Sequence, residues 1–144
     1  MKKFQSLTVM SMLFLSVFVM SYSKTLSLQQ NKLQASIERG KIVYTARCLT
    51  CHMVDGGGVQ NMNPPLLKTK WVLGDKSQLI QIVLKGMNTG VTIDDIEYHN
   101  VMASHKDLSD LQIADVLTYV RNSFGNKAKA VTEAEVKTER AKLQ

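Results

Sequence analysis

The stretch Cys48-Leu49-Thr50-Cys51-His52 is the most informative part of this 144-residue chain. Residues 33–47, directly before it, have the apolar spacing of a helix. On a helical turn Cys48 and Cys51 are three positions apart, so both thiols face the same side. His52 follows four positions after Cys48, which brings its imidazole to the same region. The three side chains can therefore act together on one ligand.

The Cys-x-x-Cys-His pattern is the attachment sequence of a c-type haem. Cys48 and Cys51 would form thioethers with the two vinyl groups of one porphyrin, and His52 would ligate the iron. A zinc site using these cysteines and two of His52, His99 and His105 is disfavoured, because neighbouring ligands fit a closed tetrahedron poorly. A thioredoxin-like thiol pair would follow a strand, and no strand is predicted before Cys48. The pattern therefore favours haem.

The N-terminus has the layout of a secretory signal peptide over residues 1–23. Lys2 and Lys3 are followed by an apolar stretch over residues 7–20 and by small residues at Ser21 and Ser23. The alternative, an uncleaved anchor, is disfavoured because a span needs about 20 apolar residues. We expect cleavage after Ser23, export to the periplasm, and a mature chain without a membrane span. Loss of the two lysines lowers the net charge from +6 to +4.

Composition limits the class of protein further. The chain is 44% hydrophobic and 21% charged, which is typical of a globular protein. Its length predicts one domain, and two cysteines exclude a disulfide framework. We expect a polar lead-in over 24–32, a main domain over 33–126 and a C-terminal extension over 127–144. Nothing in the sequence indicates a nucleic-acid partner.

Helical patterns dominate the main domain, so the predicted class is all-α. Helices are expected over 33–47, 76–85, 110–124 and about 132–142, the last as a charged surface helix. Asp75 and Ser109 are the predicted N-caps of the second and third helices. No helix or strand is predicted over 53–74 or 87–107. Loops of this length in a small domain indicate a function, and wrapping a large ligand would explain them.

A second axial ligand for the iron must come from the opposite side of the ring. Met53 adjoins His52 and cannot cross the ring, and Met62 lies on the same side as His52. The candidates that remain open are Met87, His99, Met102 and His105.

Further short segments surround the haem motif in a fixed order. In that order they resemble a class I, mono-haem bacterial cytochrome c over roughly residues 35–126. The segments are Gly40-x-x-x-Tyr44, Asp55-Gly56-x-Gly58, Pro64-Pro65-Leu66, Gly86-x-x-x-Gly90, Tyr98-x-x-x-Met102 and the run from Leu108 to Val120.

The resemblance implies a small cytochrome c fold, with helices and long loops wrapped around one haem c. Cys48 and Cys51 would hold the haem, His52 would be the proximal ligand and Met102 the distal ligand. Pro64 would accept a hydrogen bond from the proximal imidazole. The family usually has Met-Pro at the distal ligand, whereas Ala103 follows Met102 here.

Two further positions acquire roles from the resemblance. Gly40 costs about 1 kcal/mol in a helix compared with Ala, so something must pack closely against it. The resemblance implies that Gly40 and Tyr44 cross the last main helix near Tyr119. Trp71 would either donate a hydrogen bond to a haem propionate or serve as a core ring.

The function implied is electron transfer, not catalysis, because two axial ligands leave no open site on the iron. We expect a periplasmic carrier between a dehydrogenase or respiratory complex and an oxidase, as a monomer or a dehydrogenase subunit. The alternatives are a haem protein with a labile distal Met, acting as a catalyst or gas sensor, and a haem-free thiol oxidoreductase.

A basic rim around the site would steer acidic partners toward it. The candidates for this rim are Lys68, Lys70, Lys76, Lys85 and Lys106.

Overall fold

The computed structural model describes residues 2–143, with side chains from residue 25 onward. The chain divides into two units, residues 1–34 and residues 35–144. Helix α1 (Lys2–Arg47) contributes residues to both units. The signal peptide expected over 1–23 lies outside the described side chains, so its cleavage stays a prediction. Among the described residues, no helix combines the length and apolarity needed to cross a membrane.

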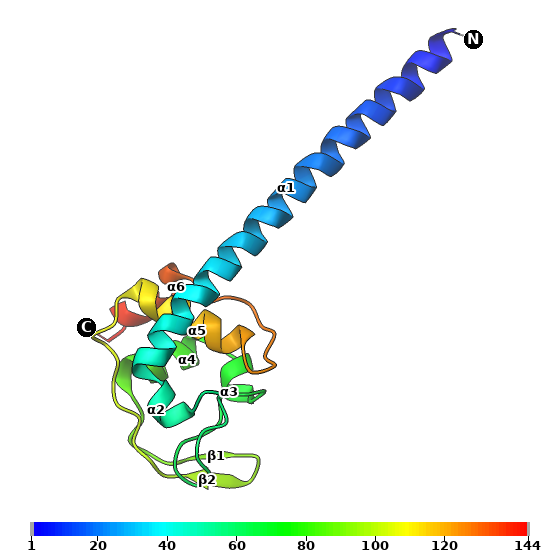
Figure 1. The fold of residues 1–144 in the computed structure, drawn as a ribbon. Coiled ribbons are helices and arrows are strands. Elements are labelled where there is room, and N and C mark those ends of the chain that lie inside the picture. The colour runs from blue at the N-terminus through cyan, green and yellow to red at the C-terminus, as the bar shows by residue number, and fades with distance from the viewer. Residues whose placement is uncertain (1, 144) are drawn as a thin grey trace. The chain divides into compact units, whose positions relative to one another are not determined.

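The second unit is mostly helical, as the sequence predicts (Figure 1). The helix expected over 76–85 is confirmed with the same bounds, and those expected over 110–124 and 132–142 are slightly shorter. In Figure 1 the helices α4 to α6 gather at one side of this unit and a hairpin lies at the other. The elements after α1 are α2 (Leu49–His52), α3 (Lys70–Leu73), α4 (Lys76–Lys85), β1 (Val91–Ile93), β2 (Ile96–Tyr98), α5 (Asp110–Asn122) and α6 (Glu133–Ala141).

Side-chain caps explain where the main helices begin. The Asp75 carboxylate accepts a hydrogen bond from the Gln78 amide at 2.8 Å and starts α4. Ser109 and Gln112 form a reciprocal capping box at the start of α5. Thr132 does the same with Glu135 at the start of α6. The predicted caps of α4 and α5 are therefore confirmed.

The expectation of no regular structure over 87–107 is wrong. Strands β1 and β2 form an antiparallel hairpin in which Val91 pairs with Tyr98. Asp94 and Asp95 both have positive φ at its turn, 50° and 62°, as the tight turn of a hairpin requires. The sequence did not predict the hairpin because each strand has only three residues and Asp-Asp is a weaker turn signal than Asn-Gly.

Two smaller differences concern an additional short helix and the residue at which the first helix begins. The short helix α3 lies within the stretch 53–74, where no helix was predicted, and the Thr69 hydroxyl accepts from the Val72 amide to cap it. Helix α1 includes residues 25–32, although the helix was expected to begin at residue 33. This stretch contains no Gly or Pro, the two residues that most oppose a helix.

The close packing expected at Gly40 is confirmed. A Cβ atom at Gly40 would lie only 2.0 Å from the Asp115 carbonyl oxygen of α5. Nearby, the rings of Tyr44 and Tyr119 have centroids 5.3 Å apart. Arg39 reinforces the crossing through an ion pair with the buried Asp115 carboxylate, at 2.6 Å. The absence of a side chain at Gly40 therefore lets α1 and α5 approach each other directly.

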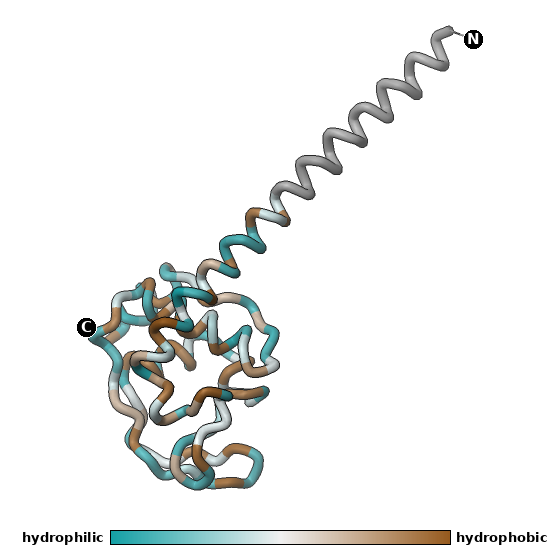
Figure 2. Tube along the Cα trace, viewed as in Figure 1, coloured by the Kyte–Doolittle hydropathy of each residue, from teal (hydrophilic) through white to brown (hydrophobic). Residues whose placement is uncertain are grey.

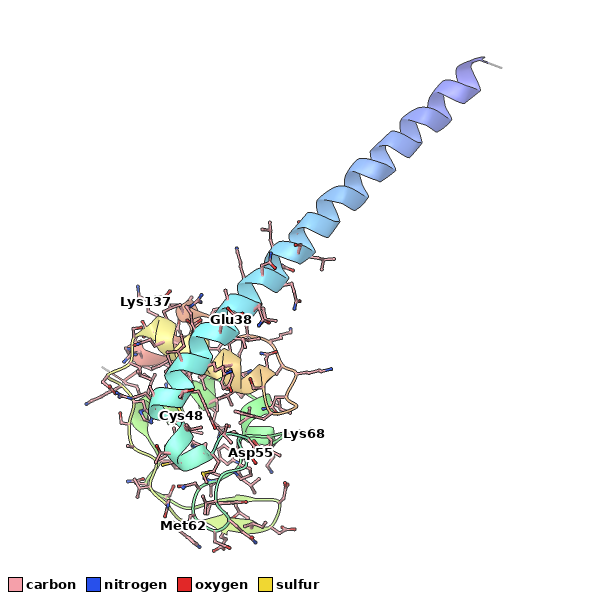
Figure 3. All side chains as sticks on the ribbon, viewed as in Figure 1. Glu38, Cys48, Asp55, Met62, Lys68 and Lys137 are labelled. Carbon is pink, nitrogen blue, oxygen red and sulfur yellow. The ribbon has the colours of Figure 1, made fainter. Side chains whose placement is uncertain are left out.

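Helix α6 packs against α4 and α5. Its Val136 side chain is fully buried, and Arg140 pairs with Asp110 of α5 at 2.6 Å. On the outer face, Lys137 is exposed (Figure 3). Figure 2 shows hydrophilic and hydrophobic residues interspersed along the chain of this unit. The charged helix expected at the surface therefore also contributes one buried side to the core.

Candidate functional site

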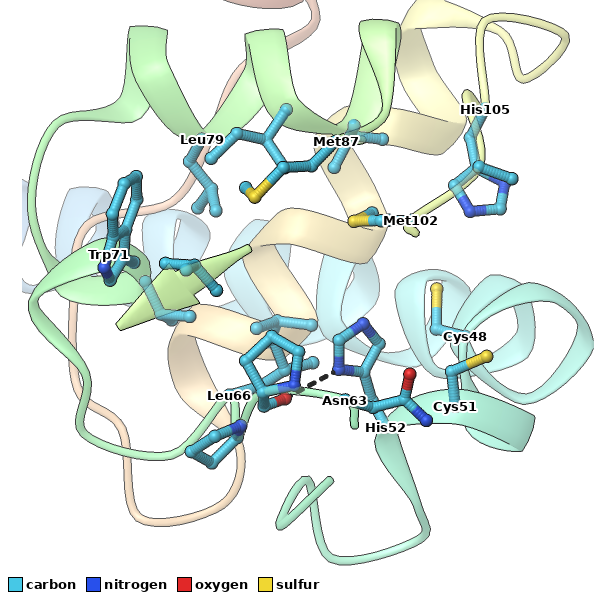
Figure 4. A pocket seen from close by; sticks show the side chains of 18 of the residues that line it. Cys48, Cys51, His52, Asn63, Leu66, Trp71, Leu79, Met87, Met102 and His105 are labelled. Carbon is cyan, nitrogen blue, oxygen red and sulfur yellow. Dashed lines mark hydrogen bonds between the residues drawn. The ribbon is translucent and has the colours of Figure 1, made fainter. Parts of the chain in front are cut away.

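The Cys-x-x-Cys-His stretch forms one helical turn directly after α1. The Cys48 amide donates to the Tyr44 carbonyl at 2.9 Å, and the His52 amide donates to the Cys48 carbonyl at 2.9 Å. Helical hydrogen bonding therefore continues through the stretch. Figure 4 shows the thiols of Cys48 and Cys51 at the same end of a cavity, with the imidazole of His52 facing into it. This is the arrangement that the spacing predicts.

The loop after α2 returns beneath His52 and orients its ring. The Gly58 amide donates to the His52 carbonyl at 3.2 Å, and the Leu66 amide donates to the Gly56 carbonyl at 2.7 Å. Within this loop, the Pro64 carbonyl lies 3.0 Å from His52 Nδ1, which is the contact that the resemblance implies. A carbonyl can only accept, so Nδ1 must carry the hydrogen and Nε2 keeps a free lone pair. Such a ring can bind a metal through Nε2.

The environment of His52 favours its neutral form. The side chain is buried, and this burial lowers the pKa of His52 below the ordinary value of 6.5. The hydrogen bond to Pro64 acts in the opposite direction but does not outweigh the burial. A neutral imidazole is the form that ligates metals, so the ring needs no deprotonation near pH 7.

A cavity of about 320 Å³ lies above His52. Its size falls within the usual range of cofactor sites, about 300–1,000 Å³. In Figure 4 the sulfur of Met102 faces this cavity from the side opposite the His52 ring. Aliphatic side chains dominate its walls, among them Leu66, Val72, Leu79, Val83, Val116, Leu117 and Val120.

The structure separates the candidates for the second axial ligand. Met87, Met102 and His105 line the cavity (Figure 4). His99 is not among the lining residues, because its side chain is 64% exposed and lies 3.6 Å from the Glu97 carboxylate. Burial lowers the pKa of His105, so its ring is neutral near pH 7. Three of the four open candidates therefore remain close to the site.

Trp71 tests whether the cavity suits a haem. It lines the cavity at the end away from the two cysteines (Figure 4), and its indole Nε1 is buried without a hydrogen-bond partner among the described residues. An unpaired buried donor costs about 1–3 kcal/mol. A porphyrin has an apolar body and acidic propionate substituents. Its body would fill the space between the aliphatic walls, and a propionate could accept a hydrogen bond from Trp71 Nε1. The residues present therefore fit a haem, and the first of the two roles considered for Trp71 is favoured.

The alternatives without haem find less support. Burial raises the pKa of the Cys48 thiol to about 11, whereas disulfide-exchange enzymes need a thiol with a lowered pKa. Among the described residues, no group of three or more His, Cys, Asp or Glu side chains is arranged to hold a metal ion. The raised pKa of Cys48 therefore disfavours a thiol oxidoreductase.

One part of the site had no sequence signal. Asn100 connects the segment before Met102 to the loop that follows His52. Its side-chain Nδ2 donates to Asn63 Oδ1 at 3.1 Å, and its backbone amide donates to the Met62 carbonyl at 3.0 Å. The His99 amide adds a bond to the Asn61 carbonyl at 3.2 Å. Met62 marks this loop in Figure 3. These partners are far apart in sequence, so no local pattern could reveal them.

The basic residue that lines the cavity is not one of the lysines expected at its rim. The predicted rim lysine Lys76 is engaged elsewhere, in an ion pair with Glu135 and a hydrogen bond to the Ala130 carbonyl. Arg47 does line the cavity and pairs with Asp107. None of the five lysines expected at the rim is among the lining residues, namely Lys68, Lys70, Lys76, Lys85 and Lys106.

A small helical unit that combines a Cys-x-x-Cys-His turn, a carbonyl-oriented histidine and an apolar cavity defines a haem-binding domain. Residues 37–124 match the family model described as cytochrome c, and the chain belongs to the cytochrome c family. Membership implies a covalently bound haem c, and proteins of this family are typically non-catalytic electron carriers. The predicted family, fold class and cofactor are thereby confirmed.

The curated relatives that match this chain are subunits of dehydrogenases and of an oxidase. The chain is 37% identical over 102 residues to the cytochrome c subunit of a quinone alcohol dehydrogenase from Gluconacetobacter polyoxogenes, covering 67% of this chain and 21% of the relative. It is 31% identical over 110 residues to the gluconate 2-dehydrogenase cytochrome c subunit of Pantoea cypripedii, covering 67% and 22%. The cbb3-type cytochrome c oxidase subunit FixP of Azorhizobium caulinodans is 33% identical over 89 residues, covering 60% and 29%. The chain thus spans only about a fifth to under a third of these relatives.

Proposed function

We propose that this chain is a periplasmic electron carrier with one haem, ligated by His52 and Met102 and attached through Cys48 and Cys51. The observation that carries this proposal is the cavity with His52 Nε2 free on one side and the Met102 sulfur on the other. Bound there, haem supplies a one-electron Fe(III)/Fe(II) couple, and a thioether ligand favours the ferrous state.

The residues around the cavity would keep this couple stable. Pro64 holds the hydrogen on His52 Nδ1, which keeps Nε2 available as a ligand and raises its basicity. The aliphatic walls would exclude water from a porphyrin bound in the cavity. If His52 and Met102 both bind the iron, no coordination site would remain for a substrate, which supports a carrier over a catalyst.

The route of the electrons is proposed from the relatives and from charge. The matched relatives are subunits of dehydrogenases and of an oxidase, so we propose that this chain exchanges electrons with a dehydrogenase or respiratory complex and an oxidase. It would act as a free monomer or as a dehydrogenase subunit, and it would be exported by a signal peptide that is cleaved after Ser23. Its positive net charge favours acidic partners.

Met102→Ala provides the test of the ligand set. The ferric wild type should show the weak near-infrared band of sulfur-to-iron coordination, and the reduced protein should resist CO. Met102→Ala should abolish the band, lower the potential and admit CO, whereas the control Met87→Ala should retain the band.

Low-spin iron in Met102→Ala would not contradict the assignment, because His105 can replace the missing sulfur. A band that survives Met102→Ala would contradict it. CO binding to the reduced wild type would instead favour the alternative of a catalyst or gas sensor with a labile Met.

A further inference from the structure

The turn that carries Met102 lacks the usual local source of rigidity. Proline fixes φ near −65°, but Ala103 follows Met102 here and has no such restriction. Methionine side chains are flexible, so the position of the sulfur depends on how firmly the backbone is held. Another feature must therefore hold this turn if Met102 is to stay above His52.

Hydrogen bonds from α4 supply that support. Met87, just after α4, pairs with Met102 in both directions, with amide-to-carbonyl distances of 2.9 and 2.8 Å. Two residues further on, the Ser104 hydroxyl donates to the Leu84 carbonyl at 2.6 Å. The His105 amide donates to the Val83 carbonyl at 2.9 Å. The turn is thus connected on both sides of Ala103.

These bonds also supply hydrogen-bond donors to carbonyl groups at the C-terminal end of α4. The last four carbonyls of a helix have no partner within the helix. Of these, the Ile82 carbonyl accepts from the Gly86 amide. Among the described residues, the partners of the Val83 and Leu84 carbonyls come from the turn that follows Met102. The end of the helix and the turn therefore stabilise each other.

Gly86 allows this close approach. Its φ of +75° favours glycine, and an added Cβ would lie 2.4 Å from the Met102 carbonyl oxygen and 2.8 Å from the Ser104 amide nitrogen. The Ser104 hydroxyl also accepts from the Lys106 amide at 3.3 Å, so it joins both the helix end and the following residues. Of the bonds described here between the turn and α4, the one from Ser104 depends on a side chain and the other is between backbone groups.

We propose that Ser104 is a positioning residue for Met102: its hydroxyl fastens the distal turn to the end of α4 and keeps the sulfur above His52. This role rests on the proposed function, because it presumes that Met102 ligates the iron. Opening of the turn is the step that would release the sulfur and let another ligand bind. The hydroxyl therefore limits how often the iron becomes accessible.

Imidazole titration of the ferric holoprotein tests this role, because imidazole can bind only while Met102 is displaced. The apparent affinity rises in proportion to the fraction of open turns. Loss of one hydrogen bond should make Ser104→Ala bind imidazole about fivefold more tightly than the wild type. Ser104→Thr keeps a hydroxyl and should behave as the wild type. Ala103→Pro, added to Ser104→Ala, should restore weak binding because it makes the turn rigid locally.

Ser109→Ala is the matched control. It also removes a serine hydroxyl, at the N-cap of α5, and should lower the stability to denaturant without changing imidazole affinity. Equal affinities in wild type and Ser104→Ala, or an equal rise in Ser109→Ala, would overturn the positioning role. A wild type without the near-infrared band would instead overturn the ligation by Met102 and, with it, this inference.

Discussion

At the scale of single residues, the cysteines decide whether the cofactor is permanent. Thioether bonds from Cys48 and Cys51 would resist extraction, so the colour should stay with the protein in acid–acetone. The intact mass should exceed that of the mature chain by one haem. Cys48→Ala or Cys51→Ala should weaken attachment, and the double variant should abolish it. Haem that is extracted from the wild type would contradict covalent attachment.

Trp71 offers a test that compares the protein with and without haem. Its buried Nε1 has no partner among the described residues, and we expect a haem propionate to accept from it. Trp71→Phe should therefore destabilise the haem-loaded protein by about 1–2 kcal/mol in denaturant unfolding. The same change should leave the haem-free protein equally stable or slightly more stable, because it removes an unpaired donor. A loss of equal size in both forms would mean that Trp71 acts only as a core ring.

At the scale of elements, the crossing of α1 and α5 depends on Gly40. Gly40→Ala would put a methyl group into the Asp115 carbonyl, a backbone atom that cannot move aside without separating the helices. We expect a loss of about 3 kcal/mol in the free energy of unfolding, measured in denaturant. The control is Gly57→Ala, where the new atom would meet only the flexible Asp55 side chain, at 3.1 Å. Similar stability of the two variants would contradict a tight crossing.

The same crossing illustrates how elements prepare the site. Tyr44 lies on the crossing, and its hydroxyl donates to the Met53 carbonyl at 2.6 Å, directly after the haem motif. Burial raises the pKa of Tyr44, so the hydroxyl remains a donor at all physiological pH values. Helix packing and the start of the loop beneath His52 are therefore connected through one side chain.

At the scale of the whole molecule, charge should govern encounters with partners. The chain carries a net charge of +6 in full and +4 after the expected cleavage, and exposed charges are screened beyond about 8 Å at physiological salt. The second-order electron-transfer rate with an acidic dehydrogenase or oxidase should therefore fall as salt rises from low to moderate concentration. The rate with a small uncharged reductant should stay constant. A rate that is flat or rises with salt for the protein partner would contradict acidic partners.

The sequence by itself determined the features whose partners lie within a few residues. Cys48, Cys51 and His52 share one helical turn, so their spacing alone predicts a common ligand. The caps at Asp75 and Ser109 bond to amides three residues away, and both were predicted correctly. These signals are reliable because local geometry leaves the chain few alternatives.

Only the tertiary structure decided the features that join distant segments. The Ser104–Leu84 and Asn100–Asn63 hydrogen bonds link positions 20 and 37 residues apart, and no local pattern marks either pair. The sequence left Met87, His99, Met102 and His105 open, and the fold removed His99 from the cavity while keeping the other three. Such contacts form only after packing has brought the segments together, because each bond is too weak to close a long loop alone.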